Sequence, residues 1–415
     1  MLHSYISTIF LTILFLSLAF FLLILPWGTK IYQLAFKDPS FTFYPYGITT
    51  VSIAAVNSIN SIISFYLRNS KQPLLFVFFS GGSFILSIIS EALAVIHFHA
   101  RAADVLIVRL SVLGFVSIVT WSLLLRKTGL RFDRRFLRAS LSYSLPIIPY
   151  VLFGFIYMSY DRIMIEQYLN MTSVAIYNLA ASIAVLSDTA LSSLENTTAP
   201  LVYEKLKESA KQNANYVSRI FRGIGLSVYS IIALLCMMAP IVIIFFLKPI
   251  YLQALILLPV LMIGYIFRYL YSLYVDPLFF FKKTKQLPWL NVVAGTITVI
   301  ANMILLPVWG LWGAAASMLL ARGAQLLLTY YLYRKYSYFR YNLTYIRPIS
   351  IGLILILLSI SLYHYWIPNM HYVFFITYSL PLFFISVFMF LYLKNKLSFR
   401  NIISKAWVVS VKNAL

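Results

Sequence analysis

The sequence contains little charge of any kind and very little negative charge. Charged residues occupy 11% of its 415 positions, compared with about a quarter in an average soluble domain. Only 11 residues are acidic, against 33 lysines and arginines, so the net charge is +22. Apolar residues make up 61% of the chain, and its mean hydropathy is +0.87. These values exclude an ordinary soluble protein and are typical of a chain immersed in lipid.

Cysteine and histidine are scarce, and this limits the available chemistry. The single Cys236 permits no intramolecular disulfide. His97 and His99 form an H-x-H pattern with no other His or Cys nearby, so we expect an interfacial position rather than a metal site. The sequence has no nucleophile–base pattern, glycine-rich phosphate loop or nucleic-acid-binding motif. We therefore expect neither an enzyme nor a nucleic-acid-binding protein, and no cofactor apart from a coupling H⁺ or Na⁺.

Apolar runs recur along the whole chain, and a run of about 20 residues can cross a bilayer core of about 30 Å as a helix. The runs are continuous rather than alternating, which excludes a membrane β-barrel. We predict an all-α polytopic membrane protein with about twelve transmembrane helices. The predicted spans are residues 4–25, 43–67, 73–98, 104–125, 141–165, 173–197, 223–247, 252–275, 287–307, 311–333, 347–366 and 371–393.

Basic residues are distributed unevenly between the predicted loops. The even-numbered loops and the C-terminal tail contain 25 lysines and arginines, whereas the odd-numbered loops contain only Lys30, Lys37, Arg101 and Lys248. Because basic loops stay on the cytoplasmic side, both termini are predicted to be cytoplasmic. The positive charge then faces the anionic lipid of the inner leaflet. The longest inward segment, 198–222, is predicted to be an amphipathic surface helix.

Several predicted spans carry polar residues in register on one helical face. Asn57 and Asn60 lie on one such face, Asn178 on a second, and Asn291 and Asn302 on a third. Hydrogen bonding between packed helices is one explanation. Charged residues occupy similar faces, however, and a charge at membrane depth is costly unless it meets water or a partner. We therefore expect a hydrated central cavity and a polar cargo.

Three stretches resemble one known family of membrane transporters. The first is "SLPIIPYVLFGFIYMSYDRIMIEQYLNMTSVAIYNLAASIA" (Ser144–Ala184), which contains a proline-containing helix, a D-R pair and an A-I-Y element. The second is "ISFYLRNSKQP" (Ile63–Pro73). The third is "VWGLWGAAASMLLARGAQ" (Val308–Gln325), and its small residues also favour close helix packing. Together they are similar to the polysaccharide-flippase branch of the MOP superfamily, the Wzx-type exporters of lipid-linked oligosaccharides.

This resemblance implies a two-lobe, MATE-like transporter bundle around a central cavity. The family starts with two further helices that are absent from this sequence, either because this branch lacks them or because the protein begins upstream. We accordingly expect an N-terminal lobe of four helices at 1–125 and a cytoplasmic linker at 126–140. A six-helix lobe at 141–333, a helix pair at 345–393 and a basic cytoplasmic tail at 394–415 are expected to follow.

The resemblance also implies a function in the inner (cytoplasmic) membrane. The protein would flip undecaprenyl-pyrophosphate-linked oligosaccharide units for O-antigen, capsule or exopolysaccharide synthesis. The expected partners are this lipid-linked oligosaccharide, membrane lipids, a polysaccharide polymerase and a chain-length regulator, and we expect a monomer. An ion-coupled multidrug or small-molecule antiporter on the same fold is the alternative. A membrane polymerase or ligase would need a sizeable outward loop, and the predicted outward loops are short.

The candidate site residues are charged or amide side chains at membrane depth. The expected cavity contacts to pyrophosphate and sugar are Arg268, Arg322, Arg109, Asn57, Asn60, Asn178, Asn291 and Asn302. The candidates for ion coupling are Asp188, Glu91 and Glu195, because burial and a nearby arginine act in opposite directions on a carboxylate. For each arginine, a permanent salt bridge with an intramembrane carboxylate is the alternative role.

Asp161 and Arg162 are expected at the outward rim of the span 141–165. Adjacent residues of a helix point about 100° apart, so we expect each of the two to have a separate partner. We predict a structural role for the pair, in anchoring and in contacts between helices.

Overall fold

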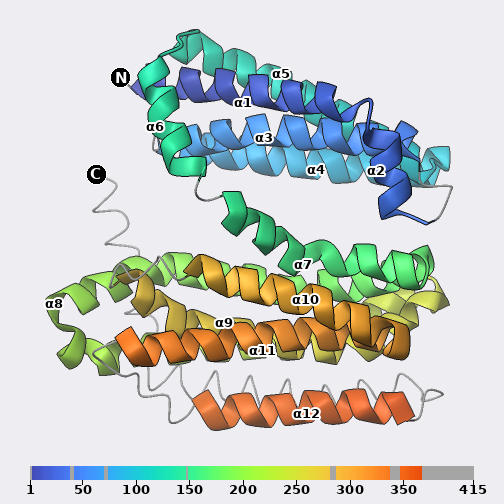
Figure 1. The fold of residues 1–415 in the computed structure, drawn as a ribbon, viewed down its shortest axis with the longest axis vertical. Helices are drawn as coiled ribbons and strands as arrows, with labels where there is room; N and C mark the ends of the chain where they lie inside the picture. Colours follow the sequence, from blue (N-terminus) through green and yellow to red (C-terminus); the bar gives the residue numbers. More distant parts are fainter. Residues whose placement is uncertain are drawn as a thin grey trace. The chain divides into compact units, whose positions relative to one another are not determined.

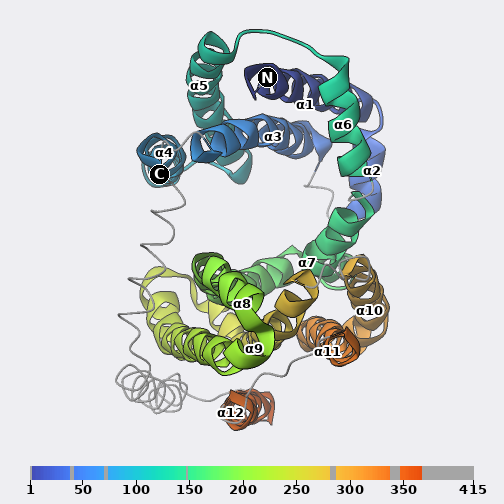
Figure 2. The same ribbon diagram turned by 90° about the vertical axis from the view of Figure 1, so that its left-hand side faces the viewer.

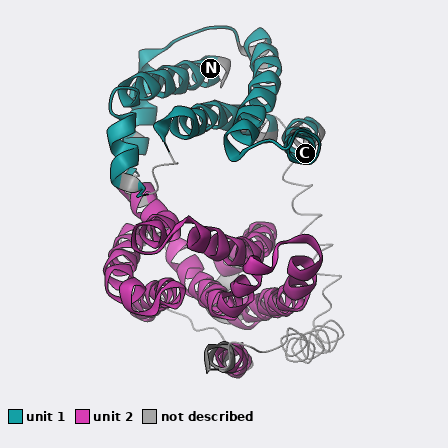
Figure 3. Cartoon of the chain, turned by 90° about the vertical axis from the view of Figure 1, so that its right-hand side faces the viewer, with its two compact units in different colours: residues 1–148 teal, residues 149–415 magenta. Residues whose placement is uncertain are grey.

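The computed structural model shows a chain built from helices (Figure 1). It describes residues 2–37, 42–69, 73–145, 148–280, 287–336 and 346–366, and no β-strand occurs in these ranges. This confirms an all-α fold, the arrangement that satisfies backbone polar groups inside lipid. The chain divides into two compact units, residues 1–148 and 149–415 (Figure 3). The predicted span 371–393 and the tail 394–415 lie outside the described residues.

Unit 1 contains four long helices and three short ones. The long helices are α1 (Leu2–Ile24), α3 (Ile48–Asn69), α4 (Pro73–Phe98) and α5 (Ala102–Thr128), and the short ones are α2 (Gly28–Ala35), the π-helix η1 (Phe43–Gly47) and α6 (Arg134–Ser144). A buried apolar cluster joins α1 to α3 through residues that include Phe10 and Ile63. The Phe10 ring also meets Trp121 of α5 in a T-shaped contact at 6.0 Å.

Helix α6 crosses the N-terminal end of α1 instead of following the long helices (Figures 1 and 2). Asp133 caps it, because its carboxylate accepts a hydrogen bond from a backbone N–H of the first turn at 2.8 Å. Ser7 and Thr8 of α1 accept hydrogen bonds from the backbone N–H groups of Arg131 and Asp133, at 2.8 and 3.0 Å. The predicted linker, 126–140, is therefore bound to unit 1, and the boundary between the units falls after residue 148.

Unit 2 is organised around α9 (Ala254–Phe280). This helix packs against α8 (Met171–Phe246), α11 (Leu311–Tyr336) and α12 (Ile346–Trp366), while α10 (Leu287–Trp309) packs against α11 (Figure 2). The apolar span that contains α9 is 67% buried, compared with 33% for α10 and for α11, so α9 is the central helix of this unit.

Two further helices lie in the described part of unit 2. Helix α7 (Ile148–Tyr168) lies against α10, where a Cβ atom added at Gly295 would meet the Phe153 carbonyl oxygen at 3.2 Å. The short 3-10 helix η3 (Pro249–Gln253) connects α8 to α9. The absence of a side chain at Gly295 thus permits the close approach of α7 and α10.

Helix α8 unites two predicted spans and the segment between them in one helix of 76 residues. Eight residues of straight helix extend about 12 Å, yet the side-chain amide of Asn213 donates to the Lys205 carbonyl at 2.9 Å. The helix therefore bends back on itself near these residues, as Figure 1 shows. Segment 198–222 is helical as predicted, but it belongs to this continuous helix and is not a separate surface helix.

Nine stretches of the described residues are long and apolar enough to cross a membrane, so the chain is a multi-pass membrane protein. They are Ser4–Ile24, Phe43–Ser64, Phe78–Phe98, Ala102–Leu123, Met171–Ala199, Asn213–Phe246, Pro249–Phe280, Leu287–Trp309 and Leu311–Tyr336. The predicted span 141–165 is not among them; its first residues belong to α6, and α7 contains Asp161, Arg162 and Glu166. Helix α12 contributes a shorter apolar stretch, Pro348–Ile360.

The turn between α10 and α11 leaves no room for a side chain at Gly313. A Cβ atom there would lie 2.2 Å from the Leu305 carbonyl oxygen. We predict that Gly313→Ala lowers the free energy of unfolding by about 1–3 kcal/mol, the usual cost of overpacking. The measurement is the Tm of the purified protein in detergent. Gly323→Ala is the control, because its Cβ atom would meet Phe267 at an ordinary 3.6 Å; equal Tm values for the two variants would contradict the close packing.

Candidate functional site

Many hydroxyl groups inside the spans bond to their own helix. Thr298 Oγ1 donates to the Ala294 carbonyl at 2.9 Å, and Ser193 Oγ donates to the Thr189 carbonyl at 2.8 Å. Such bonds to the preceding turn satisfy a hydroxyl without water or a neighbouring helix. The amide and charged side chains are therefore the better guide to where a span meets polar surroundings.

In unit 1, helices α3, α4 and α5 border a cavity of about 340 Å³. Its polar lining residues are Asn57, Asn60, Ser61, Ser64, Ser80, Ser83, Ser87, Arg109 and Thr120. The Asn60 amide is held from two sides, since it donates to Ser117 Oγ at 2.8 Å and accepts from Trp121 Nε1 at 2.9 Å. Three of the predicted cavity residues, Asn57, Asn60 and Arg109, thus lie around one cavity.

A predicted coupling carboxylate lies beside this cavity. Arg109 Nε of α5 is 3.6 Å from Glu91 Oε1 of α4, and the Arg109 side chain is 52% exposed. The exposure leaves most of the guanidinium accessible, so the ion pair with Glu91 does not use all of its donors.

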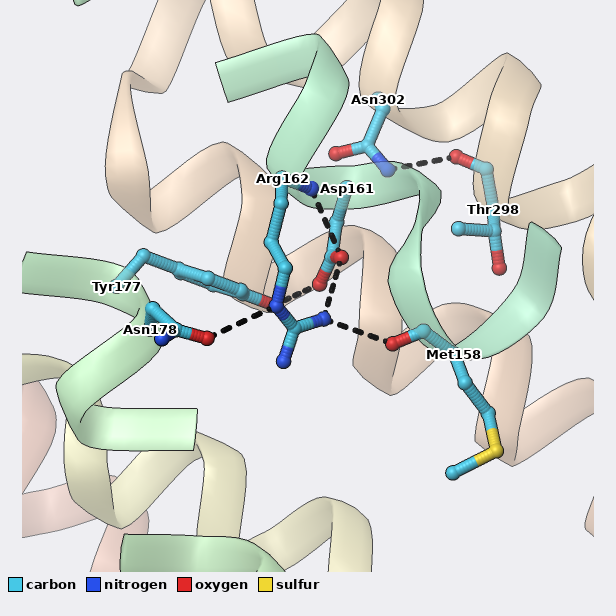
Figure 4. Close-up of polar contacts among 7 residues, drawn as sticks. All are labelled: Met158, Asp161, Arg162, Tyr177, Asn178, Thr298 and Asn302. Carbon is cyan, nitrogen blue, oxygen red and sulfur yellow. Dashed lines mark hydrogen bonds and ion pairs between the residues drawn. The ribbon is translucent and has the colours of Figure 1, made fainter. Parts of the chain in front are cut away.

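In unit 2, Asp161 and Arg162 join α7 to α8 through a polar cluster (Figure 4). Asp161 is 6% exposed, and its carboxylate accepts hydrogen bonds from the Tyr177 hydroxyl at 2.5 Å and from Arg162 Nη1 at 3.1 Å. Arg162 also donates from Nε to Asn178 Oδ1 at 3.0 Å and from Nη1 to the Met158 carbonyl at 2.8 Å. Each of the two thus has a separate partner on α8, Tyr177 for Asp161 and Asn178 for Arg162, and in addition the long arginine side chain turns back to its neighbour.

Arg322 of α11 is 9% exposed and is directed at α9. Its Nη1 donates to the Gly264 carbonyl at 3.0 Å, and its guanidinium carbon lies 4.1 Å from the centre of the Tyr265 ring. This is a cation–π distance. Arg322 also interacts electrostatically with Tyr177, so it lies near the cluster around Asp161.

The two predicted asparagines of α10 have different surroundings. Asn291 Oδ1 accepts a hydrogen bond from Gln325 Nε2 of α11 at 3.0 Å. Asn302 is fully buried, and its Nδ2 donates to the Thr298 carbonyl at 2.9 Å (Figure 4). Its Oδ1 has no hydrogen-bond partner within the described part of the chain. Asn291 therefore joins two helices, whereas Asn302 bonds within its own.

Arg268 of α9 lies between two carboxylates of α8. Its Nε is 3.3 Å from Asp188 Oδ1, and its Nη2 is 3.6 Å from Glu195 Oε2. Asp276, about two turns further along α9, interacts electrostatically with both Glu195 and Arg268. Two carboxylates thus contact one guanidinium group and a third lies within electrostatic range of it, which gives the surroundings of Arg268 an excess of negative charge when the carboxylates are ionised.

Tyr203 lies near the carboxylates of Asp276 and Glu195, in the part of α8 that connects the two apolar spans of this helix. Burial raises the pKa of the Tyr203 phenol, and the negative charges of Asp276 and Glu195 raise it further. Its ring also stacks on Phe280 at 6.1 Å. Within the described ranges, no three His, Cys, Asp or Glu side chains are grouped to hold a metal ion.

Comparison with known proteins identifies the family. The profile of the family described as "Polysaccharide biosynthesis protein" matches residues 2–256, more than half of the chain. The chain belongs to this family. The match confirms the family resemblance found in the sequence motifs, and it covers both the unit 1 cavity and the cluster around Asp161. No curated protein matches the chain.

In this polysaccharide biosynthesis protein, the polar faces of single helices indicated Asn291 but not its partner Gln325. Tyr177 belongs to the A-I-Y element and Asp276 lies about two turns after Arg268, but neither was predicted to be a site residue. Gln325 follows Arg322 by three residues and therefore shares its helical face, so this spacing could have indicated it. No fixed spacing connects Asp161 with Tyr177, because a helix–helix connection separates them.

We predict that Asp161 and Tyr177 stabilise the packing of α7 and α8 together. A hydrogen bond to a charged group contributes about 1.5–3 kcal/mol, so the cycle of Asp161→Ala, Tyr177→Phe and the double variant should give a coupling energy above about 1 kcal/mol. Denaturant unfolding in detergent measures it. Tyr160→Phe, one residue before Asp161, should change stability by less than about 0.5 kcal/mol. Strictly additive effects of the first two changes would show that the pair is not coupled.

Proposed function

We propose that this protein moves a lipid-linked oligosaccharide across the cytoplasmic membrane. The observation that carries the proposal is the presence of Arg109, Arg268 and Arg322 within membrane-spanning helices of a polysaccharide biosynthesis protein. Charged side chains at membrane depth are costly, and they commonly mark the pathway of a polar substrate. Three such residues in so apolar a chain therefore favour a polar substrate.

The chemistry of the cargo explains why a protein is required. The saccharide and pyrophosphate groups of an undecaprenyl-linked unit are strongly hydrated and cannot cross hydrocarbon unaided. The polyprenyl chain is apolar and can stay in the lipid. A flippase thus needs a polar path for the head group only, and amide, hydroxyl and guanidinium groups inside the spans would provide it.

We assign the saccharide to the unit 1 cavity. Asn57, Asn60 and the serine hydroxyls around it can both donate to and accept from sugar hydroxyls. Phe79 and Phe84 line the same cavity and offer apolar surfaces against which a sugar ring can pack. With a volume of about 340 Å³, the cavity is at the small end of the range for ligand sites and suits a short part of the oligosaccharide.

We assign contacts with pyrophosphate to Arg268 and Arg322, because a guanidinium group can bind two phosphate oxygens at once. In the described conformation Arg268 faces Asp188 and Glu195, and Arg322 donates to the Gly264 carbonyl. Substrate binding therefore requires each arginine to exchange a protein partner for phosphate. Asn178, Asn291 and Asn302 would serve as further polar contacts along the path.

Ion coupling would use the same exchange of partners at Arg268. Protonation of Asp188 or Glu195, or Na⁺ binding there, would weaken their hold on Arg268 and free it for phosphate. A membrane potential then drives the cycle, because one elementary charge gains about 2.3 kcal/mol per 100 mV. The uneven distribution of basic loops favours cytoplasmic termini. A polymerase and a chain-length regulator would then receive the unit on the outer face.

The excess carboxylates around Arg268 also suit an ion-coupled antiporter for small molecules, the second candidate function. A deletion of the gene in its own organism separates the two. Loss of a flippase should trap the lipid-linked oligosaccharide on the cytoplasmic face and remove the surface polysaccharide, and the intact gene should restore both. Normal surface polysaccharide together with altered sensitivity to toxic small molecules would contradict the flippase and support the antiporter.

We predict that Asp188→Asn uncouples transport from the ion gradient. The amide keeps the shape of the side chain but cannot bind and release a proton, and Arg268 loses one of its two charged partners. In proteoliposomes, an imposed gradient should accelerate the wild-type protein but not the variant. Asp104→Asn in α5 is the matched control, because Asp104 accepts a hydrogen bond from the backbone N–H of Arg101 at its own helix end. Full acceleration of Asp188→Asn would leave Glu195 or Glu91 as the coupling residue.

A further inference from the structure

A groove of about 450 Å³ runs between α1 and α6 in unit 1. Ile9, Ile13 and Leu16 line it along α1, and Leu137 and Leu141 line it along α6. The seven-residue step from position 9 to position 16 covers about 10 Å of helix. The groove thus starts where α6 crosses α1 and continues along the membrane span of α1.

Hydrogen bonds to the backbone and a contact between aromatic rings hold α6 against α1. In addition to the hydrogen bonds of Ser7 and Thr8, the rings of Tyr5 and Phe136 form a T-shaped contact at 5.6 Å. Because α6 crosses the end of a span, it has the orientation of an amphipathic helix at the membrane interface. One wall of the groove is therefore interfacial and the other extends into the hydrocarbon.

No basic side chain lines the groove itself, but four arginines lie in α6 or directly before it, next to the residues that do. Arg131, Arg134, Arg135 and Arg138 are exposed, and none of them forms an ion pair with a described carboxylate. The nearby Asp133 uses one carboxylate oxygen to cap α6. The charge around the groove is thus clearly positive.

One polar atom inside the groove lacks a partner. Ser140 lines the groove between Leu137 and Leu141, and its buried Oγ has no hydrogen bond to any described residue. The hydroxyl of Thr12, across the groove, is already satisfied by the Thr8 carbonyl at 2.7 Å. Ser140 can therefore donate to an acceptor group that enters the groove, such as an ester carbonyl.

We propose that this groove binds one anionic phospholipid. An acyl chain would follow Ile9, Ile13 and Leu16, the glycerol ester would meet Ser140, and the phosphate would face the arginines of α6. Basic side chains at the interface attract anionic head groups, and guanidinium groups match phosphate oxygens in geometry. The inference concerns a lipid bound to unit 1 and does not depend on the cargo that the protein transports.

Native mass spectrometry of the full-length, delipidated protein tests this assignment. The probes are phosphatidylglycerol and phosphatidylcholine with identical acyl chains. A basic residue near an anionic surface strengthens binding by about fivefold, so we expect at least about tenfold preference for phosphatidylglycerol. The triple change Arg134→Ala, Arg135→Ala and Arg138→Ala should abolish the preference. Equal binding of the two lipids by the wild-type protein, or an unchanged preference in the triple variant, would overturn the proposal.

Three further variants distinguish the contributions of the lipid head group, the acyl chain and the overall charge of the protein to binding. The triple change Arg134→Lys, Arg135→Lys and Arg138→Lys keeps the charge and should retain the preference, which would show that substitution at these positions does not by itself abolish lipid binding. The triple change Lys248→Ala, Arg334→Ala and Lys335→Ala removes the same charge elsewhere and should have no effect. Thr12→Trp, which narrows the groove, should weaken binding of both lipids; undiminished binding would refute the chain position. Tighter binding of undecaprenyl phosphate than of phosphatidylglycerol would assign the groove to the carrier lipid instead.

Discussion

A charged side chain in hydrocarbon needs a partner, and this constraint accounts for several polar contacts between helices in both units. Four arginines lie inside the spans predicted from the sequence, and each meets the constraint. Arg109 faces Glu91, Arg162 faces Asp161, Arg268 faces Asp188 and Glu195, and Arg322 faces the Gly264 carbonyl. Except for the bond between the neighbours 161 and 162, these contacts join different helices. The charged residues thus face neighbouring helices, whereas large apolar side chains such as Phe15 and Phe245 stay exposed, as lipid contact requires.

The same contacts connect stability with the proposed transport cycle. An arginine that binds phosphate must leave a carboxylate or a carbonyl, so the groups that hold the helices together are also those that the cargo would engage. The cluster around Arg268 suits such an exchange, because its carboxylates outnumber its guanidinium group and its side chains keep 19–27% exposure. The cluster around Asp161 is more deeply buried and has a hydroxyl, an amide and a carbonyl as further partners. It is the better candidate for a fixed contact between α7 and α8.

Apolar length predicted most of the helices, because a bilayer imposes a minimum span that is visible in the sequence. The fusion of two spans into α8 was not predictable in this way, since hydropathy does not show that the polar segment between them stays helical and bends between Lys205 and Asn213. Polar faces identified Asn57, Asn60 and Arg109, which the fold brings to one cavity. Partners such as Tyr177 and Gln325 depend on which helices become neighbours, and periodicity within one helix does not contain that information. Serine and threonine residues were weak indicators of a polar cavity, because their hydroxyl groups can donate to a carbonyl in the preceding turn of the same helix.

The central claim is that the polar groups inside these helices exist to carry a saccharide head group through the bilayer. Purified protein in liposomes that contain a fluorescent lipid-linked oligosaccharide tests it most directly, with a membrane-impermeant lectin added outside to detect saccharide that reaches the outer leaflet. The account predicts that all of the labelled lipid becomes accessible to the lectin in vesicles that contain the protein. In protein-free vesicles, the inner-leaflet half should stay protected. Equal protection in both kinds of vesicle would contradict the account.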